Sequence, residues 1–133
     1  FWRYLVKQTL LLVEDDKNLR FTIREILEKA EIRVLEAGNG AEALNVLDNT
    51  TKSPDLILLD LLMPVMNGFE FLQEITDTTH KSIPVLVLTG ADLSEEEQKF
   101  LSSETLRVIE KGDDTVDTIA KNIEFFVSQL SRV

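Results

Sequence analysis

Five short apolar runs, separated by amphipathic stretches, constrain the fold of this chain more than any other feature. The strands predicted from these runs are Thr9–Val13, Ile32–Glu36, Asp55–Asp60, Pro84–Thr89 and Leu106–Glu110. Most of the runs lack the polar alternation of a half-exposed strand, so they are typical of strands buried on both faces of a parallel sheet. Because helical stretches alternate with the runs, the sequence predicts an α/β fold of three layers, with five helices around a five-stranded parallel sheet.

The stretches between the runs carry the apolar periodicity and the capping residues of helices. We expect a helix over about residues 17–29 with Asp16 as its N-cap, and a second helix that Asn39 caps. Ser94–Glu97 forms a capping box for the fourth helix, and Asp113 or Asp114 is expected to cap the last one. The apolar stripe of that last helix comprises Val116, Ile119, Ile123, Phe126, Val127 and Leu130.

Length and composition exclude several classes of protein. The 133 residues fit one domain, which we place at residues 9–133, with residues 1–8 as an N-terminal extension or linker. A net charge of −10 argues against direct contact with nucleic acid, which requires clustered lysine and arginine. No apolar run approaches the ~20 residues that span a bilayer, so no membrane contact is expected. The absence of cysteine excludes thiolate metal sites and fits a reducing, cytoplasmic compartment.

Four of the runs end in side chains that can bind a metal or a phosphoryl group. Glu14 and Asp15 follow the first run, Asp60 ends the third, Thr89 ends the fourth, and Lys111 follows the fifth. We expect these groups to meet, because ligand sites of open α/β sheets lie at the carboxyl ends of the strands. Two carboxylates ~4 Å apart repel by about 4 kcal/mol at an effective dielectric constant of ~20, and Mg²⁺ is the hard cation that best offsets this. A carboxylate beside Mg²⁺, a hydroxyl and an ammonium group can accept a phosphoryl group as an aspartyl phosphate.

The motifs that carry these groups, with the spacing between them, resemble the receiver domain of two-component response regulators. The motifs are Val13–Asp16, Asp60–Pro64, Asn67–Gly68, Thr89–Gly90 and Lys111, and the resemblance covers about residues 8–131. Asp60 lies 45 residues after Asp15, 29 before Thr89 and 51 before Lys111, as in that family. The resemblance implies a flavodoxin-like fold with strand order 2-1-3-4-5. It also implies a role in a phosphorelay, in which a histidine kinase or a phosphotransfer protein supplies the phosphoryl group.

Matching positions in the family imply a role for each site residue. Asp60 corresponds to the phosphoacceptor, Thr89 to the hydroxyl that follows the phosphoryl group during switching, and Lys111 to the essential lysine. Of the acidic pair, Asp15 corresponds to the direct metal ligand, and Glu14 acts mostly through metal-bound water. The implied Mg²⁺ site therefore comprises Glu14, Asp15, Asp60 and the backbone carbonyl group of Leu62.

The chain departs from the family pattern at several positions. Gly112 replaces the usual proline after the lysine, so we expect a trans peptide bond there. Val108 replaces the usual switch aromatic and cannot swing a ring between exposed and buried positions. Leu62 and Ala91 are apolar where other receivers orient a hydrolytic water, which predicts slow autodephosphorylation. Ala91–Glu96 and the residues around Lys111 look more like receivers attached to hybrid histidine kinases.

Three functions remain open at this stage. In a phosphoacceptor module, phosphorylation would alter the surface formed by the fourth helix, fifth strand and fifth helix. That surface would then bind a partner or a second copy of the chain. A phosphohydrolase of the haloacid dehalogenase type would need an aspartate two residues after Asp60, where Leu62 stands. A degenerate receiver that binds proteins independently of phosphate is kept open by Val108 and Gly112. His80 lies in a polar connection and is not expected to be a phosphodonor.

Overall fold

The computed structural model describes residues 7–112 and 115–130, so the predicted helix cap at Asp113 or Asp114 lies outside the described residues. The strands are β1 (Thr9–Val13), β2 (Arg33–Ala37), β3 (Leu56–Asp60), β4 (Val85–Thr89) and β5 (Arg107–Glu110). The helices are α1 (Lys17–Lys29), α2 (Gly40–Asn49), α3 (Gly68–Thr76), α4 (Glu95–Glu104) and α5 (Thr115–Leu130), with a 3-10 turn, η2, at Thr79–Ser82. None of the helices described here is both long and apolar enough to cross a lipid bilayer.

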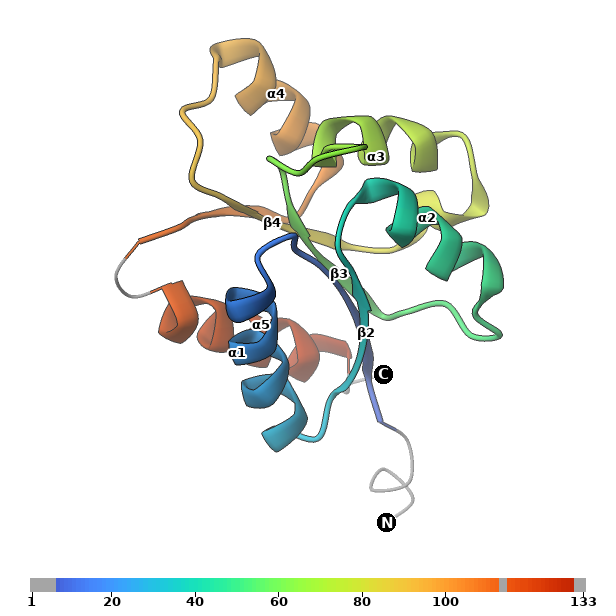
Figure 1. The fold of residues 1–133 in the computed structure, drawn as a ribbon, viewed down its shortest axis with the longest axis vertical. Helices are drawn as coiled ribbons and strands as arrows, with labels where there is room; N and C mark the ends of the chain where they lie inside the picture. The colour runs from blue at the N-terminus through green and yellow to red at the C-terminus, as the bar shows by residue number, and fades with distance from the viewer. Residues whose placement is uncertain (1–6, 113–114, 131–133) are drawn as a thin grey trace.

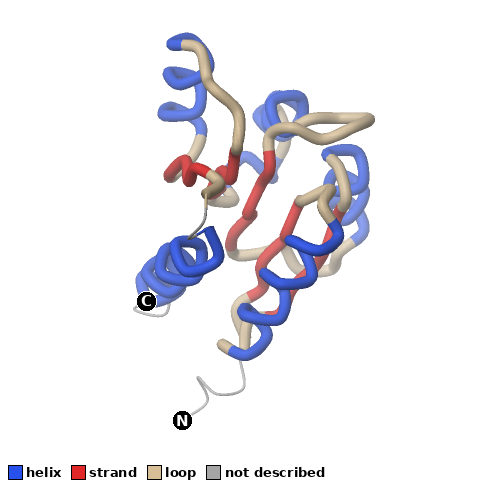
Figure 2. The backbone as a smooth tube through the Cα atoms, turned by 60° about the vertical axis from the view of Figure 1, so that its left-hand side comes forward, coloured by secondary structure: helices blue, strands red, loops and turns tan. Residues whose placement is uncertain are grey.

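The sheet is parallel throughout, and its strand order is β2-β1-β3-β4-β5. Helices α1 and α5 cover one face, and α2, α3 and α4 cover the other (Figures 1 and 2). This order confirms the predicted flavodoxin-like fold in three layers. It also places the strand-order reversal between β1 and β3, where ligand sites of such sheets occur.

The three central strands are buried along their whole length, which explains why their sequences lack polar alternation. Successive residues point to opposite faces of the sheet. Leu11, Ile57 and Val87 therefore pack beneath α2, α3 and α4, whereas Leu12 and Leu58 pack beneath α1 and α5. The edge strands β2 and β5 are only partly buried.

The predicted start of the second strand at Ile32 is wrong by one residue, as are the predicted starts of the later strands at Asp55, Pro84 and Leu106. The backbone N–H of Ile32 donates to the carbonyl oxygen of Leu27 at 3.0 Å, so this buried residue closes the end of α1. The strand instead runs on to Ala37, which lies opposite Val13 of β1. The N-caps predicted at Asp16 and Asn39 and the capping box at Ser94 and Glu97 are confirmed.

Gly68 fixes the loop that follows β3 against the end of that strand. Its N–H donates to the carbonyl oxygen of Leu61 at 2.9 Å. A Cβ atom at this position would lie 2.5 Å from the carbonyl oxygen of Asp60, so no larger residue fits without moving the backbone. The side chain of Asn67 caps α3 in a capping box with Glu70. The close approach at Gly68 therefore defines where α3 starts relative to Asp60.

Val65, in the same loop, has a φ of 68°, a left-handed conformation that is costly for a β-branched residue. The residue is 82% exposed, so little packing would be lost on truncation. We expect Val65→Gly to raise the free energy of unfolding by about 1 kcal/mol, because glycine adopts this conformation without strain. Urea unfolding checks this, with Val65→Ala as the control that keeps a Cβ atom and most of the strain. A Val65→Gly variant less stable than Val65→Ala would contradict the prediction.

Candidate functional site

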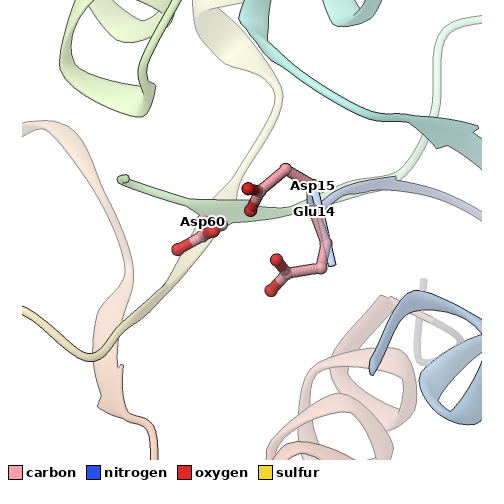
Figure 3. Close-up of side chains that lie close together, drawn as sticks. All are labelled: Glu14, Asp15 and Asp60. Atoms are coloured by element: carbon pink, nitrogen blue, oxygen red, sulfur yellow. The ribbon is translucent and has the colours of Figure 1, made fainter. Parts of the chain in front are cut away.

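The predicted acidic residues meet at the carboxyl edge of the sheet. Glu14 and Asp15 directly follow β1, and Asp60 is the last residue of the neighbouring β3. Each offers a carboxylate oxygen, and these oxygens all lie within 4.8 Å of one another. Figure 3 shows the three carboxyl groups gathered at this edge. Glu14 and Asp60 are buried and Asp15 is exposed, so the cluster is open to solvent on the side of Asp15.

Lys111, which follows β5, brings the one ammonium group that contacts these carboxylates among the described residues. Its Nζ lies 3.1 Å from Oε1 of Glu14 and 3.4 Å from Oδ1 of Asp60. One positive charge cannot balance three carboxylates. In addition, the buried Oδ2 of Asp60 has no hydrogen-bond partner within the described part of the chain.

This donor set fits a hard dication. Three carboxylates with converging oxygens suit Mg²⁺, which binds through one or two carboxylates and keeps several waters. Two buried oxygens of this set, Oδ2 of Asp60 and Oε1 of Glu14, lack a hydrogen-bond partner among the described residues, although Lys111 lies 3.1 Å from the latter. Glu14, Asp15 and Asp60 are the residues that could hold the ion. Leu62, whose carbonyl group was the fourth predicted ligand, lies two residues beyond Asp60 and is 61% exposed.

Burial shifts the acid–base behaviour of the cluster. Burial raises the pKa of Glu14 to about 7, and the charge of Asp60 adds to this effect, against the opposing contributions of the Asp16 N–H and Lys111. Burial also raises the pKa of Asp60, although Lys111 opposes it. Burial alone would lower the pKa of Lys111, but the carboxylates of Glu14 and Asp60 raise it overall. Without a metal, the cluster therefore retains a proton close to neutral pH.

We expect the stability of the metal-free protein to fall as the pH rises from about 4.5 to about 7. The pKa of Glu14 is higher in the folded chain than its ordinary value of 4.5, so folding favours the protonated form. That contribution is complete below the unfolded-state pKa and is lost as the pH passes the folded-state pKa. Thermal unfolding in EDTA across this range checks the slope.

The matched variant is Glu14→Gln, which cannot titrate. Relative to it, the wild type should lose on the order of 1–3 kcal/mol between the two ends of this range. Parallel pH profiles for the two proteins would contradict the assignment. Saturating Mg²⁺ should reduce the difference above about pH 7, because the ion replaces the proton.

Thr89 lies at the end of β4, next to β3, and is almost completely buried. Its Oγ1 accepts a hydrogen bond from the N–H of Ala91 at 3.0 Å, and its carbonyl oxygen accepts one from the N–H of Lys111 at 2.8 Å. The hydroxyl group thus ties the end of β4 to the loop that leads to α4. Its expected contact with a phosphoryl group remains a prediction.

The structure resolves several further expectations. Every described peptide bond is trans, so the bond between Lys111 and Gly112 is trans as predicted. Val108 is half-buried and packs against the core beneath α2, α3 and α4.

His80 lies in η2 ahead of β4, at the opposite edge of the sheet from Asp60, and its Nε2 is 3.6 Å from Oδ1 of Asp48. The site therefore has no contribution from His80.

Sequence reasoning missed one residue that contacts the site. In α1, Nη1 of Arg20 donates to the carbonyl oxygen of Glu14 at 2.7 Å. The available signal was an arginine one helical turn after the Asp16 cap, on a helix that starts next to the acidic pair. Sequence spacing alone does not show where a long side chain ends, so it could not predict this contact.

Comparison with known proteins identifies the same family along most of the chain. The family model described as "Response regulator receiver domain" matches residues 10–123. The chain is 43% identical over 90 residues to the transcriptional regulatory protein VxrB of Vibrio cholerae, covering 68% of this chain and 34% of that protein. It is 33% identical over 104 residues to the sensor histidine kinase CheAY of Helicobacter pylori, covering 77% of this chain and 12% of that protein.

Solved structures show the same relationship. The phosphorylated cyanobacterial phytochrome response regulator RcpA has a TM-score of 0.79 and 32% identity, covering 91% of this chain and 94% of that chain. The receiver domain of a signal transduction histidine kinase from Syntrophus aciditrophicus has a TM-score of 0.80 and 27% identity, covering 95% of this chain and 94% of that chain. The chain spans about a third of the length of the first curated relatives, which are regulatory proteins named CpxR.

Proposed function

Because the chain belongs to the response regulator receiver domain family, we propose that it accepts a phosphoryl group on Asp60 in a two-component phosphorelay. One observation carries the proposal more than any other. Asp60 is buried, yet its Oδ2 has no hydrogen-bond partner in the part of the chain that the structure describes, while Oδ1 faces Lys111 and the acidic pair lies beside it. A buried, unpartnered carboxylate oxygen is costly for a purely structural residue, and it suits a nucleophile.

The residues divide the reaction between them. A carboxylate oxygen of Asp60 attacks the phosphorus atom of the donor, a new O–P bond forms, and the bond to the donor's leaving group breaks. The ammonium group of Lys111 offsets negative charge on the transferred group, and the hydroxyl group of Thr89 can donate to one of its oxygens. Glu14, Asp15, Asp60 and the carbonyl group of Leu62 would hold Mg²⁺, which would supply further charge neutralisation.

The phosphoryl group would then act as a switch. It adds a charge of about −1.5 to −2, which the Thr89 hydroxyl can follow by leaving its bond to Ala91. The loop between them leads into α4, so the face of α4, β5 and α5 would change for a partner or a second copy of the chain. Because Val108 carries no ring, this switch works through the Thr89 loop alone.

The partners follow from the same proposal. A histidine kinase or a phosphotransfer protein is the expected phosphodonor, in the cytoplasm, with no direct contact to nucleic acid or membrane. The chain resembles both a receiver of a histidine kinase and the receiver portions of transcriptional regulators. A place in a hybrid histidine kinase agrees with the residues around Ala91 and Lys111.

Incubation with a small-molecule phosphodonor tests the proposed function. Intact-mass spectrometry should show one phosphoryl group per chain with Mg²⁺ and little with EDTA, because the carboxylates need the ion. Continuous release of phosphate without a stable adduct would support the phosphohydrolase instead. A folded chain that takes up neither Mg²⁺ nor label would support the phosphate-independent binding module.

We expect the phosphorylated chain to lose its phosphoryl group slowly, with a half-life of minutes or longer. Leu62 and Ala91 offer no polar side chain to orient a hydrolytic water, and an aliphatic group excludes water. The decay of the phosphorylated mass after removal of the donor gives the rate. Leu62→Gln should accelerate the decay by restoring a polar group. A wild-type half-life of seconds would contradict this prediction.

A further inference from the structure

Arg20 links the backbone of the acidic pair to the neighbouring strand. Its Nη1 donates to the carbonyl oxygen of Glu14 at 2.7 Å, and its Nε lies 3.3 Å from Oε1 of Glu36 on β2. The side chain is only 21% exposed. Its Nη1 also lies 3.5 Å from the place that a Cβ atom of Gly38 would occupy, so the guanidinium group packs closely over the loop after β2.

The oxygen that Arg20 holds belongs to the peptide group between Glu14 and Asp15. The side chains of Glu14 and Asp15 lie on the two sides of that peptide group, and Figure 3 shows both carboxylates near Asp60. A rotation of the peptide group would therefore displace both carboxylates. The N–H of Glu14 donates to the carbonyl oxygen of Ala37 at 3.0 Å, and Oε2 of Glu14 accepts from the N–H of Asp16 at 3.1 Å. With Arg20 on the carbonyl oxygen, the backbone of Glu14 is held on both of its polar groups.

We propose that Arg20 is a positioning residue for the metal site, which fixes the Glu14–Asp15 peptide group so that both carboxylates converge on Asp60. This inference rests on the proposed function, because it assigns Arg20 a role in Mg²⁺ binding. Removal of a group that contacts a metal-binding residue, but not the metal, typically lowers metal affinity by about 10–100-fold. Arg20 acts through the backbone and touches neither the ion nor the phosphoryl group.

Arg24 provides a matched comparison on the same helix. It also pairs with Glu36, but its other partner is Glu28 of α1, 3.1 Å away, and its side chain is 43% exposed. Both arginines therefore offer one positive charge to Glu36, and Arg20 alone of the two contacts Glu14. If loss of helix charge or of the Glu36 ion pair changes Mg²⁺ affinity, substitution of either arginine should change it. If Arg20 positions the Glu14–Asp15 peptide group, only substitution of Arg20 should.

The experiment compares wild type, Arg20→Met, Arg24→Met and Arg20→Lys by calorimetric titration with MgCl₂, together with thermal unfolding in EDTA. We expect Arg20→Met to weaken Mg²⁺ binding about tenfold and Arg24→Met to change it by less than about twofold. Arg20→Lys should recover part of the affinity, because an ammonium group can donate to the carbonyl oxygen but lacks the planar fork that also reaches Glu36.

Equal Mg²⁺ affinity of Arg20→Met and Arg24→Met would overturn the inference while leaving the proposed function intact. A wild type that binds no Mg²⁺ would overturn both. An equal loss of thermal stability in EDTA for the two variants, combined with a loss of Mg²⁺ affinity for Arg20→Met alone, would support positioning over a general loss of structure.

Discussion

Asp60→Asn will reduce phosphoryl incorporation to the background level while the chain stays folded. An amide lacks the nucleophilic carboxylate oxygen that an aspartyl phosphate requires. The substitution also removes one of two buried carboxylates that share Lys111, so the pKa of Glu14 will fall towards its ordinary value. Intact-mass spectrometry after treatment with a phosphodonor and Mg²⁺ measures the loss, and thermal unfolding in EDTA reports the folded state.

Asp16→Asn is the matched control for this experiment. Asp16 is the next acidic residue after the pair, but it is exposed and its side chain caps α1 by accepting from the N–H groups of Asn18 and Leu19. Asparagine caps helices as well as aspartate does, so labelling and stability should both stay near wild type. Labelling of Asp60→Asn at the wild-type level would place the phosphoacceptor elsewhere and remove the basis of the proposed function.

The fold was predictable because each central strand is a continuous apolar run, which only a sheet covered on both faces can bury. The exact strand ends were less predictable. Ile32 is β-branched and apolar, as strand residues often are, yet its backbone N–H bonds to the end of α1. Apolar character alone does not distinguish these two roles, because both bury the side chain. The deciding contact is the hydrogen bond from the backbone N–H of Ile32 to the carbonyl oxygen of Leu27.

The site was predictable to the extent that the sheet fixes it. Residues that end neighbouring parallel strands must meet at one edge, so Glu14 and Asp60 could be brought together from strand order alone. Lys111 follows β5, two strands away from β3, so its contact with Asp60 also depends on the reach of its side chain. Arg20 could not be placed in this way, because its contact depends on how far a long side chain reaches from α1.

The strained φ of Val65 was also outside the reach of sequence reasoning. The next residue, Met66, makes two backbone hydrogen bonds. Its N–H donates to the carbonyl oxygen of Pro64, and its carbonyl oxygen accepts from the N–H of Gly40 at the start of α2. The conformation of Val65 therefore follows from where the loop docks on a helix that comes earlier in the chain.

Lys111→Met should slow phosphorylation by about 10²–10³-fold, the usual effect of removing one group aimed at transition-state charge. Nζ of Lys111 lies 3.1 Å from Glu14 and 3.4 Å from Asp60, so it stands where charge on a transferred phosphoryl group would develop. The initial rate of labelling, followed by intact mass at saturating Mg²⁺, measures the effect. Lys99→Met on α4 removes an exposed lysine outside the site and should leave the rate unchanged.

Mg²⁺ affinity should not fall together with the labelling rate in Lys111→Met. The ammonium group competes with the dication for the same carboxylate oxygens, so its removal leaves a more negative cluster. At about pH 9, where protons compete less for these carboxylates, calorimetry should show Mg²⁺ binding as tight as in wild type or tighter. Slower labelling with undiminished Mg²⁺ binding would assign Lys111 to the phosphoryl group. Weaker Mg²⁺ binding would instead mean that Lys111 organises the carboxylates, and the loss of rate would then follow from a damaged metal site.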